Sequence, residues 1–212
     1  MNYKGIIFDL DGVICYSDKF HYEAWKRIAE EEGICFDENV NARLRGVSRM
    51  ESLDIILEKA KRTYSDVEKK ELADKKNSYY VKLLENMSTE HMAFGVKETL
   101  ESLKSAGIKT AIGSSSKNTR LIMDKLKLSS YFDAVSDGTM IRNSKPDPEV
   151  FLKAAELLQL SPSECLVVED AVAGIEAAVR GGFAAAAIGD AWKHEEAAYK
   201  IQTLSELINI VK

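Results

Sequence analysis

The chain has 212 residues, of which 45% are hydrophobic and 30% are charged, a balance typical of a soluble globular protein. Its formal net charge of −5 argues against a nucleic-acid binder, and no apolar run reaches the length that spans a bilayer. No signal-peptide pattern opens the chain and the cysteines lie far apart, so we expect a cytoplasmic protein without a disulfide framework.

The first predicted element is a buried strand at residues 6–8, which leads into Asp9, Asp11 and Gly12. Because side chains two apart on a strand point the same way, the two aspartates are expected to face one site. Gly12 would let the backbone turn away from it. By itself this stretch is as consistent with a turn as with an active site, since Asp and Gly are common turn residues.

A long helical region follows. Residues 16–32 show apolar positions at helical spacing and end at Gly33, which predicts one helix. From Asp37 to about Ser88 there are further helical stripes and no convincing strand. Connections between a strand and its next helix are usually short, so this region is better explained as an insertion. We therefore predict an all-helical cap domain at 16–91 and a core domain made of 1–15 and 92–212.

From Gly95 onward the pattern alternates between helices and strands. Strands are predicted at 108–112, 132–135, 165–168 and 184–188, the last of the chain, and helices at 96–106, 119–128, 148–160, 171–180 and 204–211. This alternation predicts the α/β class with a doubly wound parallel sheet, whose strand-to-helix loops collect at one edge. That edge would hold Asp9, Asp11, Ser114 and Asp170 together.

Acidic, polar and cationic residues accompany the first aspartates at this edge. Glu169 and Asp170 end another apolar strand, and clustered buried carboxylates repel one another unless a cation or a proton compensates. Oxygen ligands of this kind suit Mg²⁺. The run 114–116 precedes a helix, where hydroxyls and free N–H groups bind phosphate, and Lys145 could balance the charge of a phosphoryl group.

Each of these features has a simpler explanation when it is taken alone. A serine run before a helix is often only a cap, Lys145 with Pro146 is often a helix entry, and Glu169 with Asp170 could cap the following helix. Their occurrence together at the strand ends of one sheet is hard to explain by turns.

Taken in order, residues 8–13, the Ser114 loop, Lys145-Pro146 and Glu169-Asp170 resemble the four motifs of the haloacid dehalogenase superfamily, and this resemblance spans the whole chain. The insertion after the first motif is similar to that of the helical-cap subclass. Within the subclass the chain most resembles the β-phosphoglucomutases. The residues behind this closer resemblance are His21, Trp25, 45–49, Lys76-Asn77 and 114–118.

The resemblance implies roles for residues of the core. Asp9 would be the nucleophile that forms an aspartyl-phosphate, and Asp11 would be the general acid and base. Ser114 and Lys145 would hold the transferring phosphoryl group. The implied Mg²⁺ ligands are Asp9, the Asp11 carbonyl, Asp170 and, as a further candidate, Glu169.

The resemblance also implies roles for residues of the cap. Arg49 would bind the second phosphate of the substrate, which a guanidinium suits geometrically, and His21 would help to position Asp11. Further residues expected to contact the sugar phosphate are Trp25, Gly46, Lys76, Ser115, Ser116 and Asn118. From the residues alone, packing of His21 and Trp25 against the core, and a cap or salt bridge from Arg49 to a neighbouring helix, would be favoured.

The leading hypothesis is an isomerase, expected to be monomeric, that interconverts β-D-glucose 1-phosphate and glucose 6-phosphate. It would use Mg²⁺ and a bound β-glucose 1,6-bisphosphate. The alternatives are a Mg²⁺-dependent phosphatase of sugar phosphates or other small phosphoesters, and a phosphosugar-binding module, which would not need both Asp9 and Asp11. Arg49 favours the isomerase, because a phosphatase need not bind a second phosphate. No function is assigned to the segment after Gly189.

Overall fold

The computed structural model describes residues 3–211, and the chain divides into two compact units. The α/β unit contains the residues up to Tyr16 and those from Ser88 onward, and the helical unit contains Ser17–Met87. The second junction therefore precedes the predicted one at 91/92. The Tyr16 N–H donates to the His91 carbonyl at 2.9 Å, and this bond ties the segment after Met87 to the α/β unit.

The α/β unit is built on a parallel sheet with the strand order β3-β2-β1-β4-β5-β6. The strands are β1 Gly5–Phe8, β2 Lys109–Gly113, β3 Ala134–Ser136, β4 Cys165–Glu169, β5 Ala184–Ala187 and β6 Tyr199–Lys200. This confirms the predicted doubly wound parallel sheet. The strand order reverses between β1 and β4, where open α/β sheets bind ligands outside the carboxyl ends of the strands.

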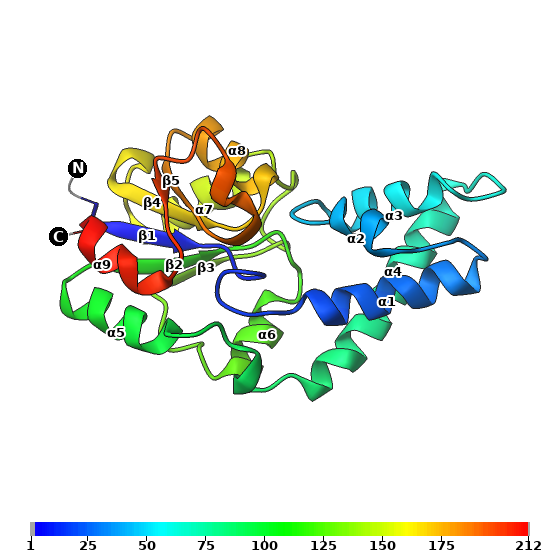
Figure 1. The fold of residues 1–212 in the computed structure, drawn as a ribbon, viewed down its shortest axis with the longest axis horizontal. Helices are drawn as coiled ribbons and strands as arrows, with labels where there is room; N and C mark the ends of the chain where they lie inside the picture. The colour runs from blue at the N-terminus through cyan, green and yellow to red at the C-terminus, as the bar shows by residue number, and fades with distance from the viewer. Residues whose placement is uncertain (1–2, 212) are drawn as a thin grey trace. The chain divides into compact units, whose positions relative to one another are not determined.

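Helices cover both faces of this sheet (Figure 1). One face carries α7 (Glu149–Leu158) and α8 (Val172–Arg180), and the other carries α5 (Val96–Ser105), α6 (Thr119–Leu126) and α9 (Leu207–Val211). Both faces are therefore buried, which explains why β1 and β4 are uninterrupted apolar runs up to their ends. Short 3₁₀ helices complete the unit: η2 Thr89–His91, η3 Pro162–Glu164, η4 Gly189–Lys193 and η5 Leu204–Glu206.

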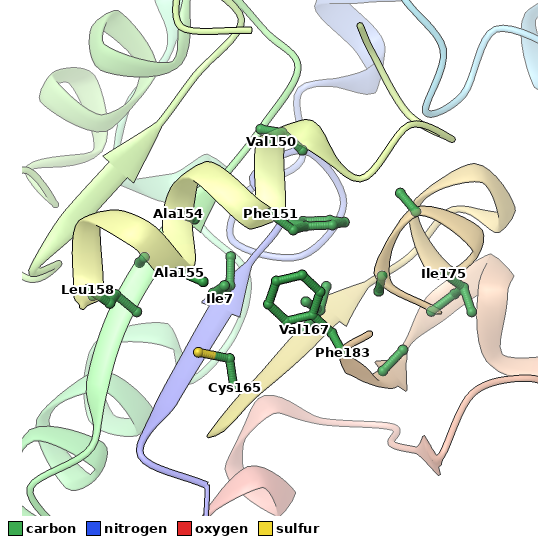
Figure 2. Close-up of a cluster of buried hydrophobic side chains, with 14 of the residues drawn as sticks. Ile7, Val150, Phe151, Ala154, Ala155, Leu158, Cys165, Val167, Ile175 and Phe183 are labelled. Carbon is green, nitrogen blue, oxygen red and sulfur yellow. The ribbon is translucent and has the colours of Figure 1, made fainter. Parts of the chain in front are cut away.

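The face under α7 and α8 holds a hydrophobic cluster that includes Ile7, Phe151, Val167 and Phe183 (Figure 2). The rings of Phe151 and Phe183 meet edge to face, with centroids 6.3 Å apart. A Cβ added to Gly113 at the end of β2 would lie 2.7 Å from the Phe151 ring. Helix α7 thus packs directly on the sheet near the carboxyl ends of its strands.

The helical unit has a core of its own. Its helices are α1 Asp18–Glu31, α2 Glu38–Ala42, α3 Arg49–Leu57, α4 Asp66–Leu83 and the 3₁₀ helix η1 Leu84–Asn86. Capping boxes, Ser48 with Glu51 and Ser65 with Glu68, fix where α3 and α4 begin. The buried core comprises Trp25, Ile28, Ala29, Ile34, Val40, Leu44, Leu53, Ile56, Leu72 and Ala73.

The C-terminal region differs most from the sequence prediction. The predicted strand at 184–188 is not the last, because β6 follows at Tyr199–Lys200. The predicted helix at 204–211 begins as the 3₁₀ helix η5 before α9 continues it. Elements as short as β6 and η4 leave no periodic pattern of side chains. Among the helices of residues 3–211, none combines the length and apolarity that crossing a membrane demands.

Candidate active site

The carboxyl ends of β1 and β4 bring three carboxylates together. Asp9 directly follows β1, Glu169 is the last residue of β4, and Asp170 comes next. The Asp9 N–H donates to the Val168 carbonyl at 2.9 Å, which places Asp9 beside the end of β4. Each of the three side chains offers a carboxylate oxygen within 4.8 Å of the others. The side-chain cluster does not include Asp11, whose predicted metal contact is through its backbone carbonyl.

Lys145 places a positive charge among these carboxylates. Its Nζ lies 2.5 Å from Asp9 Oδ1 and 2.5 Å from Glu169 Oε1. The Lys145 side chain is only 3% exposed, and its ammonium lies 4.6 Å from the centroid of the Phe151 ring. The second oxygen of Glu169 accepts a hydrogen bond from the Ala171 N–H at 2.8 Å. Both oxygens of Glu169 are therefore engaged within the protein.

Burial and charge together shape the electrostatics of the cluster. Burial raises the pKa of Asp9 to about 8; Lys145 opposes the rise, whereas Glu169 and Asp11 add to it. Burial alone would lower the pKa of Lys145, but Asp9 and Glu169 more than offset this and raise that pKa above its usual value. The lysine stays protonated, and the carboxylates still outnumber the cation. A divalent cation would relieve their repulsion.

The donor set fits Mg²⁺, which prefers carboxylate and carbonyl oxygens. Glu169 uses one oxygen on Lys145 and the other on the Ala171 N–H. Lys145 contacts Asp9 through Oδ1. Glu169 thus pairs with Lys145 and, because one of its oxygens lies in the same cluster as those of Asp9 and Asp170, it stays a predicted further ligand.

Asp170 is supported by main-chain segments that precede and follow it in the sequence. Gly12 has a φ of +89°, and a Cβ there would lie 2.1 Å from Asp170 Oδ2, so the carboxylate rests directly on the turn after β1. The Ala191 N–H, in η4, donates to the Asp170 carbonyl at 2.9 Å. Gly189, with a φ of +59°, begins η4. No role was predicted for this segment, although a glycine after an apolar run is a signal of a loop at a strand end.

The predicted phosphate loop follows β2. The Ser114 N–H donates to the Ser136 carbonyl at 3.1 Å, and the Ser114 Oγ accepts from the Ser116 N–H at 3.2 Å. The Ser116 Oγ accepts in turn from the Asn118 N–H at 3.2 Å, and Asn118 is the N-cap residue of α6. In the described part of the chain, no hydrogen-bond partner satisfies the buried Ser115 Oγ. The loop is thus a series of serine turns that leads into a helix N-terminus.

Predicted substrate-binding residues of the helical unit gather around Lys76. Its Nζ lies 2.8 Å from His21 Nδ1, 4.6 Å from the centroid of the Tyr80 ring and 4.8 Å from that of Trp25. An ammonium can only donate, so His21 Nδ1 accepts and the neutral imidazole carries its proton on Nε2. Desolvation, followed by the charges of Lys76 and Arg49, holds the pKa of His21 well below 6.5.

The other predicted cap residues have distinct surroundings. Arg49 begins α3 and donates from its guanidinium to Asn77 Oδ1 at 2.9 Å. Gly46 has a φ of +74° in the turn between α2 and α3. Trp25 is 2% exposed and belongs to the core of the helical unit. This burial supports the packing explanation of Trp25, and a contact of Trp25 with substrate stays a prediction.

Comparison with known proteins gives concordant results. A family model described as haloacid dehalogenase-like hydrolase matches residues 3–182. The chain is 42% identical over 188 residues to a β-phosphoglucomutase of Bacillus subtilis (strain 168), with 88% of this chain and 83% of the relative covered. It is 34% identical over 183 residues to a phosphorylated carbohydrates phosphatase of Thermotoga maritima, with 84% and 82% covered. The crystal structure of a β-phosphoglucomutase from Clostridium difficile superposes with a TM-score of 0.90 at 37% identity, covering 97% of this chain and 93% of that one.

Proposed function

We propose that this chain, which belongs to the haloacid dehalogenase-like hydrolase family, interconverts β-D-glucose 1-phosphate and glucose 6-phosphate. The observation that carries this proposal is the cationic group around Lys76 in the helical unit. Arg49 and Lys76 both place positive charge near His21 and offer hydrogen bonds for a second phosphate, in addition to the group at Asp9 that would hold the transferring one. The 42% identity to a β-phosphoglucomutase supports the same assignment.

Asp9 is the proposed nucleophile. In one half-reaction, the 6-hydroxyl of β-glucose 1-phosphate attacks the phosphorus of an Asp9 aspartyl-phosphate, and Asp11 takes the hydroxyl proton as the Asp9 carboxylate leaves. This gives β-glucose 1,6-bisphosphate. In the other half-reaction, Asp9 attacks the phosphorus at position 1 and Asp11 returns the proton to the departing sugar oxygen. Dividing the transfer into two steps is the usual benefit of a covalent nucleophile.

The residues around Asp9 would stabilise the charge of the transferring group. Lys145, which stays protonated beside Asp9 and Glu169, would attract the phosphoryl oxygens. Ser114, with the N–H groups that precede α6, would orient the same group. When bound by Asp9, Asp170 and the Asp11 carbonyl, Mg²⁺ would neutralise part of the charge on the phosphoryl oxygens.

The helical unit would bind the part of the substrate that does not react. Arg49 would contact the second phosphate, and Lys76 would contact the sugar phosphate. The proposed role of His21 is to position Asp11, and the Lys76 contact suits it because it keeps a proton on Nε2 for donation. Ser115, Ser116, Asn118 and Gly46 remain candidates for further contacts with the sugar phosphate.

A phosphatase is the second candidate function, and the 34% identity to a phosphatase of phosphorylated carbohydrates favours it. It would use the same aspartyl-phosphate, with water in place of the sugar hydroxyl. Asp9, Asp11 and Lys145 would keep their roles, whereas the cationic group around Lys76 would have less to bind.

One assay separates the two functions. The protein receives β-glucose 1-phosphate, Mg²⁺ and a trace of β-glucose 1,6-bisphosphate, and glucose 6-phosphate and free phosphate are measured separately. The Asp9→Asn variant serves as the control for contaminating activity. We expect glucose 6-phosphate to form with little free phosphate. Rapid release of phosphate with little isomerisation would favour the phosphatase, and no turnover of any phosphoester would leave only a binding module.

A further inference from the structure

Gly174 lies in α8, directly against the carboxylate of Glu169. A Cβ added at Gly174 would lie 1.9 Å from Glu169 Oε1 and 2.0 Å from Glu169 Cδ. These separations are far inside van der Waals contact, so no side chain at this position is compatible with the observed carboxylate. Gly174 is not among the glycines of the described chain with positive φ, and therefore space, rather than backbone conformation, explains the glycine.

The oxygen that approaches Gly174 is the one that holds Lys145. Glu169 Oε1 lies 2.5 Å from Lys145 Nζ, and the same Nζ lies 2.5 Å from Asp9 Oδ1. Glu169 is 1% exposed and its other oxygen accepts the Ala171 N–H, so the carboxylate has little freedom to move aside. Displacing Glu169 would therefore displace the ammonium beside Asp9.

Helix propensity does not explain a glycine at position 174. Within a helix, glycine is less favourable than alanine, because it loses more backbone entropy on folding. Helix α8 otherwise uses small and aliphatic residues on its buried face, including Ile175, Ala177 and Ala178. The missing methyl group at position 174 makes room specifically for the Glu169 carboxylate.

We propose that Gly174 is a positioning residue for phosphoryl transfer: its bare Cα admits the Glu169 carboxylate that holds Lys145 against Asp9. The inference rests on the proposed function for its catalytic meaning. Gly174 itself would not contact the substrate; it acts through the side chains of Glu169 and Lys145.

The test compares Gly174→Ala in two backgrounds. Binding of inorganic phosphate in the presence of Mg²⁺ is measured by calorimetry, and isomerisation is measured in parallel. In the wild-type background, we expect phosphate affinity and kcat to fall by about 10–100-fold, the range typical when a supporting residue is lost. In a Glu169→Ala background, the added methyl group has no carboxylate to displace, and Gly174→Ala should cause no further loss.

The second background keeps the test decisive if Gly174→Ala alone fails to fold, because the Glu169→Ala/Gly174→Ala double variant has room for the methyl group. A further loss of affinity in the double variant relative to Glu169→Ala would contradict the proposal, as would equal affinity of wild type and Gly174→Ala. Thermal unfolding and the neighbouring Ala173→Ser variant report general damage to α8. Failure of the wild type to isomerise sugar phosphates would count against the proposed function and leave the comparison of phosphate affinities intact.

Discussion

At the scale of single residues, Lys145 carries the charge that allows Asp9 and Glu169 to lie together inside the protein. Its ammonium contacts both carboxylates and the face of Phe151, so the residue after β1, the end of β4 and helix α7 all contact this one side chain. Buried ion pairs add little net stability, but removing one member leaves the other charge buried without compensation.

We predict that Lys145→Met destabilises the metal-free protein by about 3–5 kcal/mol, because Asp9 and Glu169 lose their buried counter-charge. Urea unfolding with and without Mg²⁺ measures the change, and Mg²⁺ should recover part of it. The matched control is Lys153→Met, which removes a solvated pair with Glu156 on α7 and should cost about 0–1 kcal/mol. Equal destabilisation by the two variants would show that the buried contact contributes no more to the free energy of unfolding than the exposed pair does.

Arg49 is the residue that best separates the two candidate functions. Arg49→Ala should reduce isomerisation much more than it reduces hydrolysis of a small phosphoester that carries one phosphate, since only the sugar bisphosphate offers a second phosphate to bind. Steady-state kinetics with both substrates provides the comparison. Arg43→Ala, which removes a solvated pair with Glu58 in the same unit, is the control and should leave both rates unchanged. If Arg49→Ala slowed both reactions equally, Arg49 would not be the second-phosphate contact.

At the scale of elements, α1 and α4 are joined by the contact between His21 and Lys76. Desolvation, with the charges of Lys76 and Arg49, holds the pKa of His21 well below its ordinary 6.5. In the unfolded chain the imidazole regains its ordinary pKa. Below pH 6.5 the unfolded state therefore binds more protons than the folded state, and stability falls as the pH falls.

We accordingly predict that the free energy of unfolding of the wild type falls between about pH 7 and about pH 5, and that His21→Asn makes this dependence shallower. Urea unfolding across this range measures both slopes. Ser78→Ala, which removes a hydroxyl of α4 that donates to the Asp74 carbonyl and introduces no titratable group, is the control and should keep the wild-type slope. Identical slopes for the wild type and His21→Asn would mean that folding does not lower the pKa of His21.

Some helices and strands could be predicted from the sequence and others could not. Long periodic helices and the apolar strands β1 and β4 were predictable, and with them the meeting of Asp9, Glu169 and Asp170 at one edge. The two-residue strand β6 and the turn η4 were not, because their formation depends on pairing and packing with distant segments. Side-chain contacts were also beyond prediction: spacing alone cannot show that Glu169 binds Lys145 or that Trp25 is buried in the helical core.

At the scale of the whole molecule, each unit places a lysine ammonium beside one or more aromatic rings. Lys145 lies over Phe151 in the α/β unit, and Lys76 lies near Trp25 and Tyr80 in the helical unit. Such surroundings exclude water and strengthen the interaction of a cation with an anionic ligand. The protein carries a net charge of −5, so the positive charge of Lys76 and Arg49 in the helical unit, rather than the overall charge, would attract a sugar phosphate.

The proposed reaction requires the Asp9 carboxylate to accept a phosphoryl group from a sugar phosphate. The most direct measurement is to mix the enzyme with β-glucose 1,6-bisphosphate and Mg²⁺, quench rapidly, and locate the covalent phosphate by mass spectrometry. We predict phosphate on Asp9 within the turnover time and none in the Asp9→Asn variant. Formation of glucose 6-phosphate without any phosphorylated Asp9, or with the phosphate on another residue, would show that Asp9 is not the nucleophile.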